Sequence, residues 1–493
     1  MKPLAAGPGL PSAVPPAAQV ARALWCDAGL APEALARLEL TGAEPAVPSS
    51  FAVGTALQAS LGVAALAAAE LGAAHGAAQG GPLQRVSVDT ADVVREAACR
   101  FTLDGREPPA WEPLSGLYRC ADSDEAGSAG WVRVHANFAH HRDGVLRLLG
   151  LPEGPQTPRA AIEAALREWP ALRFEAEASA RGLVVAAVRT PAQWRALEQA
   201  QAVAAEPLVS IERIDDGGSN AAPTGWRPTD AHRAPLGGLR VLELTRILAG
   251  PVAGRTLAAY GADVLLVNAP HLPNIEAIAD TSRGKLSAHL DLRDAEQAAR
   301  LRELVRAGDV FLQGYRPGAL AAYGFAPQDL ARLKPGIVCV SLSAYGATGP
   351  WAQRRGFDSL VQSTMGINVA EAEAFGETKP RSLPLAALDY GAGYLLAFGA
   401  LAALHRQRRE GGSWHVQVSL AGVGHWLQSL GRVNGGPHAA PLSFDGMMEE
   451  SASGFGLLCA VRHAARLSAT PAQWLRPSMP PGSHAAAWPS RSG

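Results

Sequence analysis

One carboxylate stands apart from the other charges of the chain, in a long apolar stretch from Leu383 to Leu404. The apolar pattern predicts a helix of about four to five turns, with Asp389 at its start. Three glycines beside it, Gly391, Gly393 and Gly399, allow a ligand or another backbone to come close. Free N–H groups at a helix N-terminus keep a carboxylate ionised and can hold an oxyanion. Asp389 is therefore a candidate nucleophile.

The same position also has a purely structural explanation. Asp is a favoured helix N-cap, because its side chain accepts hydrogen bonds from the first N–H groups of the helix. The residues around Asp389 do not distinguish a nucleophile from a helix cap. Only the rest of the chain can decide between these two roles.

Length, charge and cysteine content exclude several classes of protein. The 493 residues suffice for two or three domains with sizeable cores. A formal net charge of -1 gives no reason to expect a nucleic-acid partner. Five cysteines are scattered without a CxxC pair or a histidine cluster at metal spacing, so we expect neither a disulfide framework nor a metal site. Pro and Gly interrupt the N-terminus, and the longest apolar runs, which contain Glu70 and Asp389, fall short of a membrane span. These features predict a cytoplasmic protein without a membrane partner.

The N-terminal half contains a unit that the C-terminal half repeats. Residues 51–100 predict an Ala-rich helix, a Val-x-Val strand and a second helix. The same order of helix, glycine turn, strand and helix returns in residues 390–430. This similarity predicts a duplicated unit, in which Ala52 or Phe51 occupies the position that Asp389 has in the second copy.

The remaining segments predict the fold class. Residues 111–213 have the pattern of a small α+β module, and from residue 236 onward strands alternate with helices, which is typical of a mostly parallel sheet. The first strand-to-helix turn, Ala249 to Gly254, lacks the GxGxxG spacing of a dinucleotide site, so NAD is not expected. A ligand should still bind at the carboxyl ends of the strands. We predict an α/β fold: a Rossmann-like, mostly parallel sheet with helices on both faces, plus a smaller α+β domain.

Composition divides the chain further. The segment from Asp215 to Gly225 is rich in Gly, Ser and Asp and is typical of a linker. The predicted organisation is an N-terminal extension (1–44), a degenerate helix-hairpin repeat (45–110), a small α+β domain (111–213), a linker (214–235), a Rossmann-like domain (236–435) and a C-terminal tail (436–493).

A series of short motifs in the second half resembles a known family. The motifs run in order through Gly238–Thr245, Ala249–Pro251, Gly261–Val264, Arg283–Lys285, Leu290–Leu292, Arg316–Gly318, Tyr345–Pro350, Gly356–Gln362, Asp389 and Val416–Leu420. This series, which covers roughly residues 236–430, resembles the family III CoA-transferases, which include formyl-CoA and carnitine-CoA transferases and the related α-methylacyl-CoA racemases.

The resemblance implies a chemistry for Asp389. In the implied reaction the carboxylate attacks an acyl-CoA thioester to give a mixed anhydride and then an aspartyl-CoA thioester, from which an acceptor carboxylic acid takes the CoA. Coenzyme A is then the one expected cofactor, without metal or NAD, and the family implies a homodimer of interlocked chains. The implied CoA contacts are Arg246, Ile247, Leu248, Ala249, Lys285, Arg316, Tyr345 and Gly346. The charged groups of the cations suit phosphates, but a solvated surface charge is the alternative explanation of each cation. For the loop with Tyr345, the alternatives are a CoA contact and a simple turn.

The chain also departs from the family in informative ways. Phe357 stands where the racemases carry a histidine, which favours transfer over racemisation because Phe cannot exchange a proton. Asp358 and Gln362, four apart on a predicted helix, have a structural explanation. The small domain lies upstream of the Rossmann-like region instead of downstream, which predicts a rearranged fusion. A CoA-ester isomerase or dehydratase, and a non-catalytic CoA-binding subunit, stay open as alternatives.

Overall fold

The computed structural model describes residues 13–76, 83–109, 111–121, 130–214, 226 and 234–490. Its largest sheet has seven strands in the order β10-β9-β8-β11-β12-β13-β7. All neighbours are parallel except β7, which runs antiparallel to β13. This sheet confirms the predicted α/β fold class. The strands are β7 (Ser210–Ile214), β8 (Arg240–Leu244), β9 (Asp263–Asn268), β10 (Leu286–His289), β11 (Val310–Gln313), β12 (Val338–Ser343) and β13 (Ser413–Ser419).

Helices cover both faces of this sheet. Successive residues of a strand point to opposite faces, so each strand contributes side chains to both helix layers. On one face, Val241 and Val310 pack with the apolar sides of α9 and α15. On the other face, Leu242 and Phe311 pack with α11 and α12. The helices are α9 (Ala249–Ala259), α10 (Ile278–Thr281), α11 (Ala295–Arg306), η3 (Ala321–Tyr323), α12 (Pro327–Leu333) and α15 (Ala387–Glu410).

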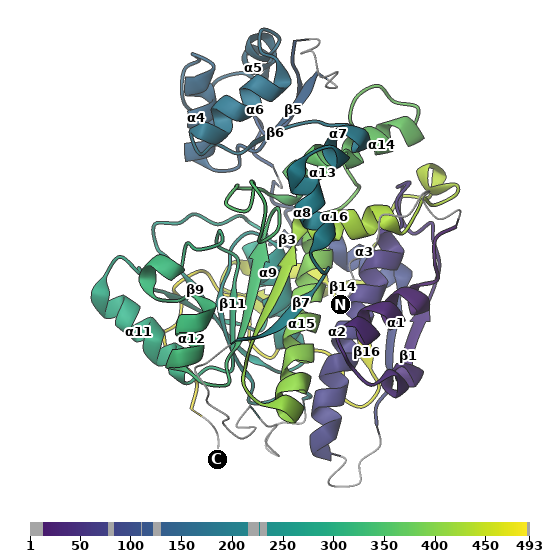
Figure 1. Ribbon diagram of the computed structural model, residues 1–493, viewed down its shortest axis with the longest axis vertical. Helices are drawn as coiled ribbons and strands as arrows, with labels where there is room; N and C mark the ends of the chain where they lie inside the picture. The colour runs from purple at the N-terminus through teal and green to yellow at the C-terminus, as the bar shows by residue number, and fades with distance from the viewer. Residues whose placement is uncertain are drawn as a thin grey trace.

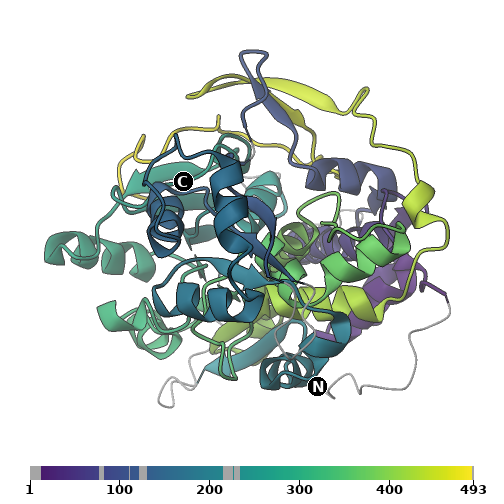
Figure 2. The ribbon, with the colours of Figure 1, turned by 90° about the horizontal axis from the view of Figure 1, so that it is seen from above.

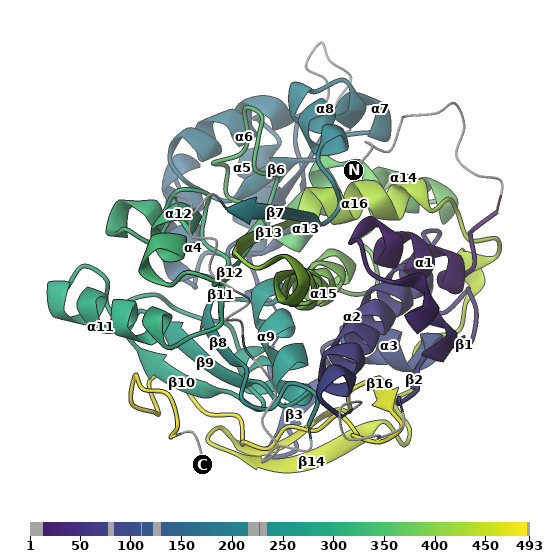
Figure 3. The same cartoon turned by 60° about the horizontal axis from the view of Figure 1, so that its bottom comes forward.

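Two long apolar helices, α15 and α2 (Val53–Gly76), lie against each other, and α1 (Ala17–Asp27) packs on α2. Figure 3 shows α15 nearly end-on between α2, α9 and β13. By length and composition both helices are able to cross a membrane, contrary to the expectation from sequence. However, 83% and 94% of their most apolar windows are buried inside the protein. Both are core helices.

The helix, strand, helix order predicted twice is present twice. Helix α2 precedes β2 (Val86–Asp89) and α3 (Thr90–Ala97), and α15 precedes β13 and α16 (Leu420–Ser429). The upstream strand does not join the large sheet. Instead, β2 lies parallel to β1 (Leu38–Thr41) and antiparallel to β16 (Ala465–Leu467). The short helix η1 (Pro32–Arg37) precedes β1.

The small α+β module has its own antiparallel sheet and its own core. Its elements are β4 (Gly116–Arg119), β5 (Trp131–Val134), α4 (Ala139–Leu148), α5 (Arg159–Leu166), α6 (Ala171–Ala180) and β6 (Val185–Ala187), followed by α7 (Pro191–Arg195) and α8 (Glu198–Ala205). Figure 1 shows the module at the top of the molecule, above the large sheet. Strands β5 and β6 contact α13 (Asp358–Thr364), which follows β12. The predicted module extended to residue 213, but strand β7 at its end belongs to the large sheet.

The C-terminal residues connect distant parts of the chain. Strands β14 (Met448–Ser453) and β15 (Gly456–Val461) form a sheet with β3 (Phe101–Leu103), and Figure 2 shows this yellow hairpin beside the blue β3 segment. The following tail packs against α9, where Trp474 donates a hydrogen bond to the Arg255 carbonyl at 3.0 Å. The remaining helices are α14 (Ile367–Ala374) and η4 (Gly436–His438).

Candidate active site

Asp389 lies in the first turn of α15, but it does not cap the helix. Asp358, the first residue of α13, does so. Its Oδ2 atom accepts hydrogen bonds from the backbone N–H groups of Leu388 at 2.9 Å and Asp389 at 3.0 Å, and Gln362 donates to its other carboxylate oxygen. The capping explanation of Asp389 is therefore wrong. The Asp389 side chain stays half-buried, so it is partly accessible to solvent.

Both carboxylates have a raised pKa. Burial raises the pKa of Asp358 to about 6, although hydrogen bonds from Asp389 N–H, Gln362 and Leu388 N–H, and the charge of Arg133, oppose the shift. Burial and then the Asp358 charge raise the pKa of Asp389 well above its ordinary value. The sequence predicted that the N–H groups at the start of the helix keep Asp389 ionised. They do not, because they donate hydrogen bonds to Asp358 instead. Asp389 is thus an unusually basic carboxylate, which is a stronger nucleophile once it loses its proton.

The loop from Arg246 to Ala249 lies beside Asp389. Helix α9 packs against α15, and Gly393 makes this approach possible, since a Cβ there would lie 2.7 Å from the Ala249 carbonyl oxygen. Asp389 is one helical turn before Gly393, on the same face of α15. Within the loop Ile247 has a φ of +75°, a conformation that non-glycine residues rarely adopt. The predicted strand-end loop and the predicted nucleophile are therefore neighbours.

Three guanidinium groups follow three adjacent strands of the sheet: Arg246 after β8, Arg316 after β11 and Arg355 after β12. Arg316 and Arg355 are exposed, and Arg246 is half-buried. Burial and then the charge of Arg316 lower the pKa of Arg355, which shows that these two cations lie near each other. A cluster of guanidinium groups at the carboxyl ends of parallel strands fits a ligand that carries phosphates.

Lys285 is fully buried, which contradicts the expectation that it contacts CoA phosphates. Its ammonium pairs with Glu243 at 2.8 Å and donates to the Pro251 carbonyl at 2.8 Å. Gly254 leaves room for the pair, because a Cβ there would lie 1.8 Å from Glu243 Oε2. The ion pair thus holds α9 against β8 from within the core, and its charge is not available to a ligand.

Replacing Lys285 by Met is expected to lower the free energy of unfolding by about 3–5 kcal/mol, because Glu243 is left as a buried carboxylate without its cation. Burial already raises the pKa of Glu243 and lowers the pKa of Lys285, so each charge is costly at this place. Urea unfolding measures the change. The double variant Lys285→Met with Glu243→Leu removes both charges and should recover most of the loss. An equal loss in the single and double variants would contradict this account.

The loop with Tyr345 and Gly346 is also covered, which contradicts the expectation that these two residues contact CoA. The Tyr345 side chain is buried, with its hydroxyl oxygen 3.3 Å from Thr364 Oγ1. Gly346 has a φ of +103°, and a Cβ there would lie 2.8 Å from a carboxylate oxygen of Glu206. Glu206 itself accepts a hydrogen bond from Ala347 N–H at 3.0 Å. The loop therefore anchors the segment after α8, as the simple-turn alternative predicts.

Two histidines of the small module lie beside the residue that precedes Asp358. His135 stacks on Phe357 with ring centroids 4.0 Å apart, and His141 meets the same ring edge-on at 6.5 Å. Both are buried, with 4% and 5% of their surface exposed. Sequence reasoning missed them, because a histidine in a separate module gives no sign of its neighbours in space. For His141, the adjacent His140 was the one available signal.

The small module therefore covers the carboxyl ends of the sheet near Asp389. Besides the contact of His135 with Phe357, the Arg246 guanidinium lies over the Phe138 ring, 5.5 Å from its centroid. Phe357 directly precedes Asp358, which accepts hydrogen bonds from the first turn of α15, and Arg246 precedes α9, whose first residue lies beside Gly393. The small module thus contacts both segments that lie near the predicted nucleophile.

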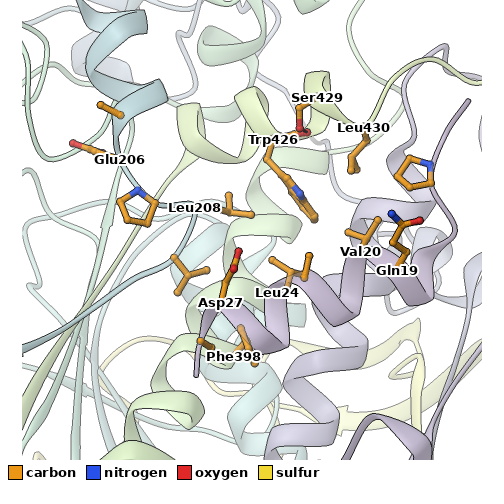
Figure 4. Close-up of a pocket in the computed structure, with 16 residues that line it drawn as sticks. Gln19, Val20, Leu24, Asp27, Glu206, Leu208, Phe398, Trp426, Ser429 and Leu430 are labelled. Carbon is orange, nitrogen blue, oxygen red and sulfur yellow. Dashed lines mark hydrogen bonds between the residues drawn. The ribbon is translucent and has the colours of Figure 1, made fainter. Parts of the chain in front are cut away.

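A hollow of about 240 Å³ lies elsewhere, between α1, α16 and the loop before β7. Figure 4 shows Leu24 and Asp27 of α1 facing Trp426 of α16, with Phe398 of α15 on the lower side. Phe398 follows Asp389 by nine residues, about 13 Å along the helix axis. The hollow is therefore separate from the first turn of α15.

Comparison with known proteins supports the resemblance to a family over part of the chain. The sequence profile of CoA-transferase family III matches residues 236–439. This match covers less than half of the chain, which is therefore similar to CoA-transferase family III in these residues. The matched region contains β8 to β13, α15 and Asp389, so it holds the candidate nucleophile and the strand-end arginines. The small module with His135 and His141 lies outside the match.

Family III relatives match the chain only in part. An acyl-CoA transferase of Gibberella moniliformis is 32% identical over 322 residues, which are 62% of this chain and 56% of that protein. A succinate–glutarate CoA-transferase of Agrobacterium fabrum is 35% identical over 211 residues, which are 39% of this chain and 52% of that protein. The chain thus spans about half the length of these relatives. A crystal structure from Mycobacterium tuberculosis is 34% identical, with a TM-score of 0.36, over 40% of this chain and 58% of that one.

Proposed function

We propose that this protein is an acyl-CoA:carboxylate CoA-transferase whose nucleophile is Asp389. The observation that carries the proposal is a half-buried aspartate of raised pKa, beside a second carboxylate, at the carboxyl ends of a parallel sheet. It lies in the region that matches CoA-transferase family III, and the relatives named above are an acyl-CoA transferase and a CoA-transferase by their names.

In the proposed reaction CoA moves without any net gain or loss of protons. An ionised Asp389 oxygen attacks the thioester carbon, the C–S bond breaks, and CoA leaves as a thiolate from a mixed anhydride. The thiolate then attacks the aspartyl carbonyl carbon, and the acyl group leaves as a free carboxylate. The same two steps in reverse, with an acceptor carboxylate as the attacking group, give the new acyl-CoA and return Asp389 to its starting form.

The neighbouring residues have separate tasks in this scheme. Burial and Asp358 make Asp389 basic, while Asp358 fixes its backbone position. The start of α9 has no side-chain cap, so its first N–H groups can hold the oxyanion that forms on the thioester carbonyl. Arg246, Arg316 and Arg355 bind the phosphates of CoA. Lys285, Tyr345 and Gly346 support the structure and do not contact the substrate.

Replacing the exposed Arg316 or Arg355 by Gln is expected to raise KM for an acyl-CoA about tenfold and to leave kcat nearly unchanged, because a phosphate contact far from the reacting atoms is lost. The difference from the unmodified protein should shrink at high salt, which screens exposed charges. Steady-state kinetics at two ionic strengths measure both effects. Arg332→Gln, an exposed arginine of α12, is the matched control. An equal KM for all three variants would contradict the phosphate assignment.

Acyl exchange tests the proposed function directly. The protein is mixed with an unlabelled acyl-CoA and the corresponding ¹³C-labelled acid, and the acyl-CoA is followed by mass spectrometry. We expect label to enter the acyl-CoA without hydrolysis. Exchange of the α-proton with solvent in the absence of any acid would favour the isomerase or dehydratase instead. Calorimetric CoA binding without turnover of any acyl-CoA would favour the non-catalytic subunit. A homodimer and a cytoplasmic location stay predictions.

A further inference from the structure

Within the described ranges, the buried imidazoles of His135 and His141 lack the hydrogen-bond partners that buried polar groups usually have. All four of their ring nitrogens are buried and have no hydrogen-bond partner among the described residues. A buried polar atom without a partner costs about 1–3 kcal/mol, so folded proteins rarely keep one without a use. Two adjacent imidazoles with four such atoms therefore indicate a group that binds there and is not part of the protein.

The groups around the two histidines indicate what kind of atom binds. The Nε atoms of Arg133 and Arg246 are likewise buried without a partner in the described part of the chain. Burial first, and then positively charged neighbours that include Arg133 for His135 and Arg246 for His141, lower the pKa of each histidine to about 3. Each ring is thus neutral and carries one N–H donor. Donors in a positive field fit an oxygen atom that accepts hydrogen bonds.

The position of the pair relative to Asp389 indicates which part of a substrate carries that oxygen. His135 stacks on Phe357, the next residue is Asp358, and Asp358 accepts the Asp389 N–H. His141 and Arg246 both contact Phe138, and Arg246 begins the loop beside Asp389. The histidines are therefore close to the nucleophile but separated from it by the Phe357 ring and by Asp358. An oxygen bound there belongs to a part of the substrate away from the carbon that Asp389 attacks.

We infer that His135 and His141 form the specificity site for an acyl group that bears a second oxygen function, such as a hydroxyl or a further carboxylate, beyond its reacting carboxyl. This inference rests on the proposed function for the identity of the reacting carbon. A site with unpaired buried donors rejects an analogue that lacks the oxygen, because the donors then stay unpaired. Simple alkanoyl groups of the same length are thus poor substrates.

The test compares three four-carbon substrates, butyryl-CoA, 3-hydroxybutyryl-CoA and succinyl-CoA, in the unmodified protein and in His135→Phe and His141→Phe. Phe keeps the ring contacts and removes the nitrogens. We expect the unmodified protein to favour an oxygen-bearing substrate over butyryl-CoA by about 10- to 100-fold in kcat/KM, and each variant to lose most of this preference. The comparison of 3-hydroxybutyryl-CoA with succinyl-CoA shows whether a hydroxyl or a carboxylate oxygen is preferred. His405→Phe, on α15 sixteen residues after Asp389, is the control and should keep the preference.

Binding distinguishes a failure of this inference from a failure of the proposed function. Non-reacting thioether analogues of CoA with a butyl, a 3-hydroxybutyl or a 3-carboxypropyl group are titrated calorimetrically into the same proteins. The same preference in Kd, lost in the two histidine variants, supports the specificity site even if no transfer is observed. Equal Kd values for the three analogues in the unmodified protein, no binding of any analogue, or a preference that survives both His→Phe variants overturns it.

Discussion

Replacing Asp389 by Asn is expected to lower kcat/KM for CoA transfer by about 10⁴-fold or more, because the amide cannot attack a thioester and no other carboxylate takes its place. Asn has nearly the shape of Asp, and the backbone N–H of residue 389 still donates to Asp358. The fold and the affinity for acyl-CoA should therefore change little. Steady-state exchange kinetics and calorimetry measure the two quantities.

The matched control for this variant is Asp294→Asn. Asp294 also lies at the start of a helix, where it accepts hydrogen bonds from Glu296 N–H and Gln297 N–H, but it is exposed and caps α11. Because Asn caps a helix about as well as Asp, its replacement should change stability little and leave transfer unchanged. Transfer by Asp389→Asn at more than a tenth of the original rate would eliminate Asp389 as the nucleophile.

Replacing Asp358 by Asn is expected to move the acid limb of the pH dependence of kcat/KM to lower pH by on the order of one unit. The nucleophile must be ionised, so transfer rises with pH as Asp389 loses its proton. The Asp358 charge adds to burial in raising the pKa of Asp389, and Asn removes that charge. Its amide oxygen can still accept from Leu388 N–H and Asp389 N–H, so the start of α15 stays in place. Activity profiles between pH 4 and 8 measure the shift.

The same substitution has a defined effect on stability. Asp358 has a folded-state pKa of about 6, above its ordinary value near 3.9. Between these values the folded state binds more protons than the unfolded state, so the stability contribution is full below about pH 4 and is lost as pH rises through 6. Urea unfolding of Asp358→Asn should show a weaker decline over this range. An unchanged acid limb together with an unchanged stability profile would contradict the coupling of the two carboxylates.

The sequence was sufficient for the large sheet because its strands are short, apolar and separated by helices that begin and end at recognisable residues. Val310 to Leu312 and Ile337 to Ser341 are fully apolar or nearly so, as strands covered on both faces must be. The position of Asp389 at a helix start was also predictable, since a single charge interrupts a long apolar run. The family match covers residues 236–439, which contain these segments.

The partners of Asp389 were not predictable in the same way. Asp358 precedes it by 31 residues and was explained as part of its own helix, because spacing within α13 shows only the contact with Gln362. Lys285 was predicted as a CoA contact, with a solvated surface charge as the alternative, since its buried partner Glu243 lies 42 residues away. His135 comes from another module altogether. These contacts depend on how the elements pack, and no local pattern records that packing.

A covalent intermediate on Asp389 is the most direct test of the proposed reaction. The protein is incubated with acyl-CoA without an acceptor acid, digested at low pH and analysed by mass spectrometry, with and without hydroxylamine. We predict that a peptide containing Asp389 carries CoA as a thioester, that hydroxylamine converts it to a hydroxamate at Asp389, and that Asp389→Asn carries neither. Rapid transfer without any adduct on this peptide, or an adduct on a different residue, would contradict the account.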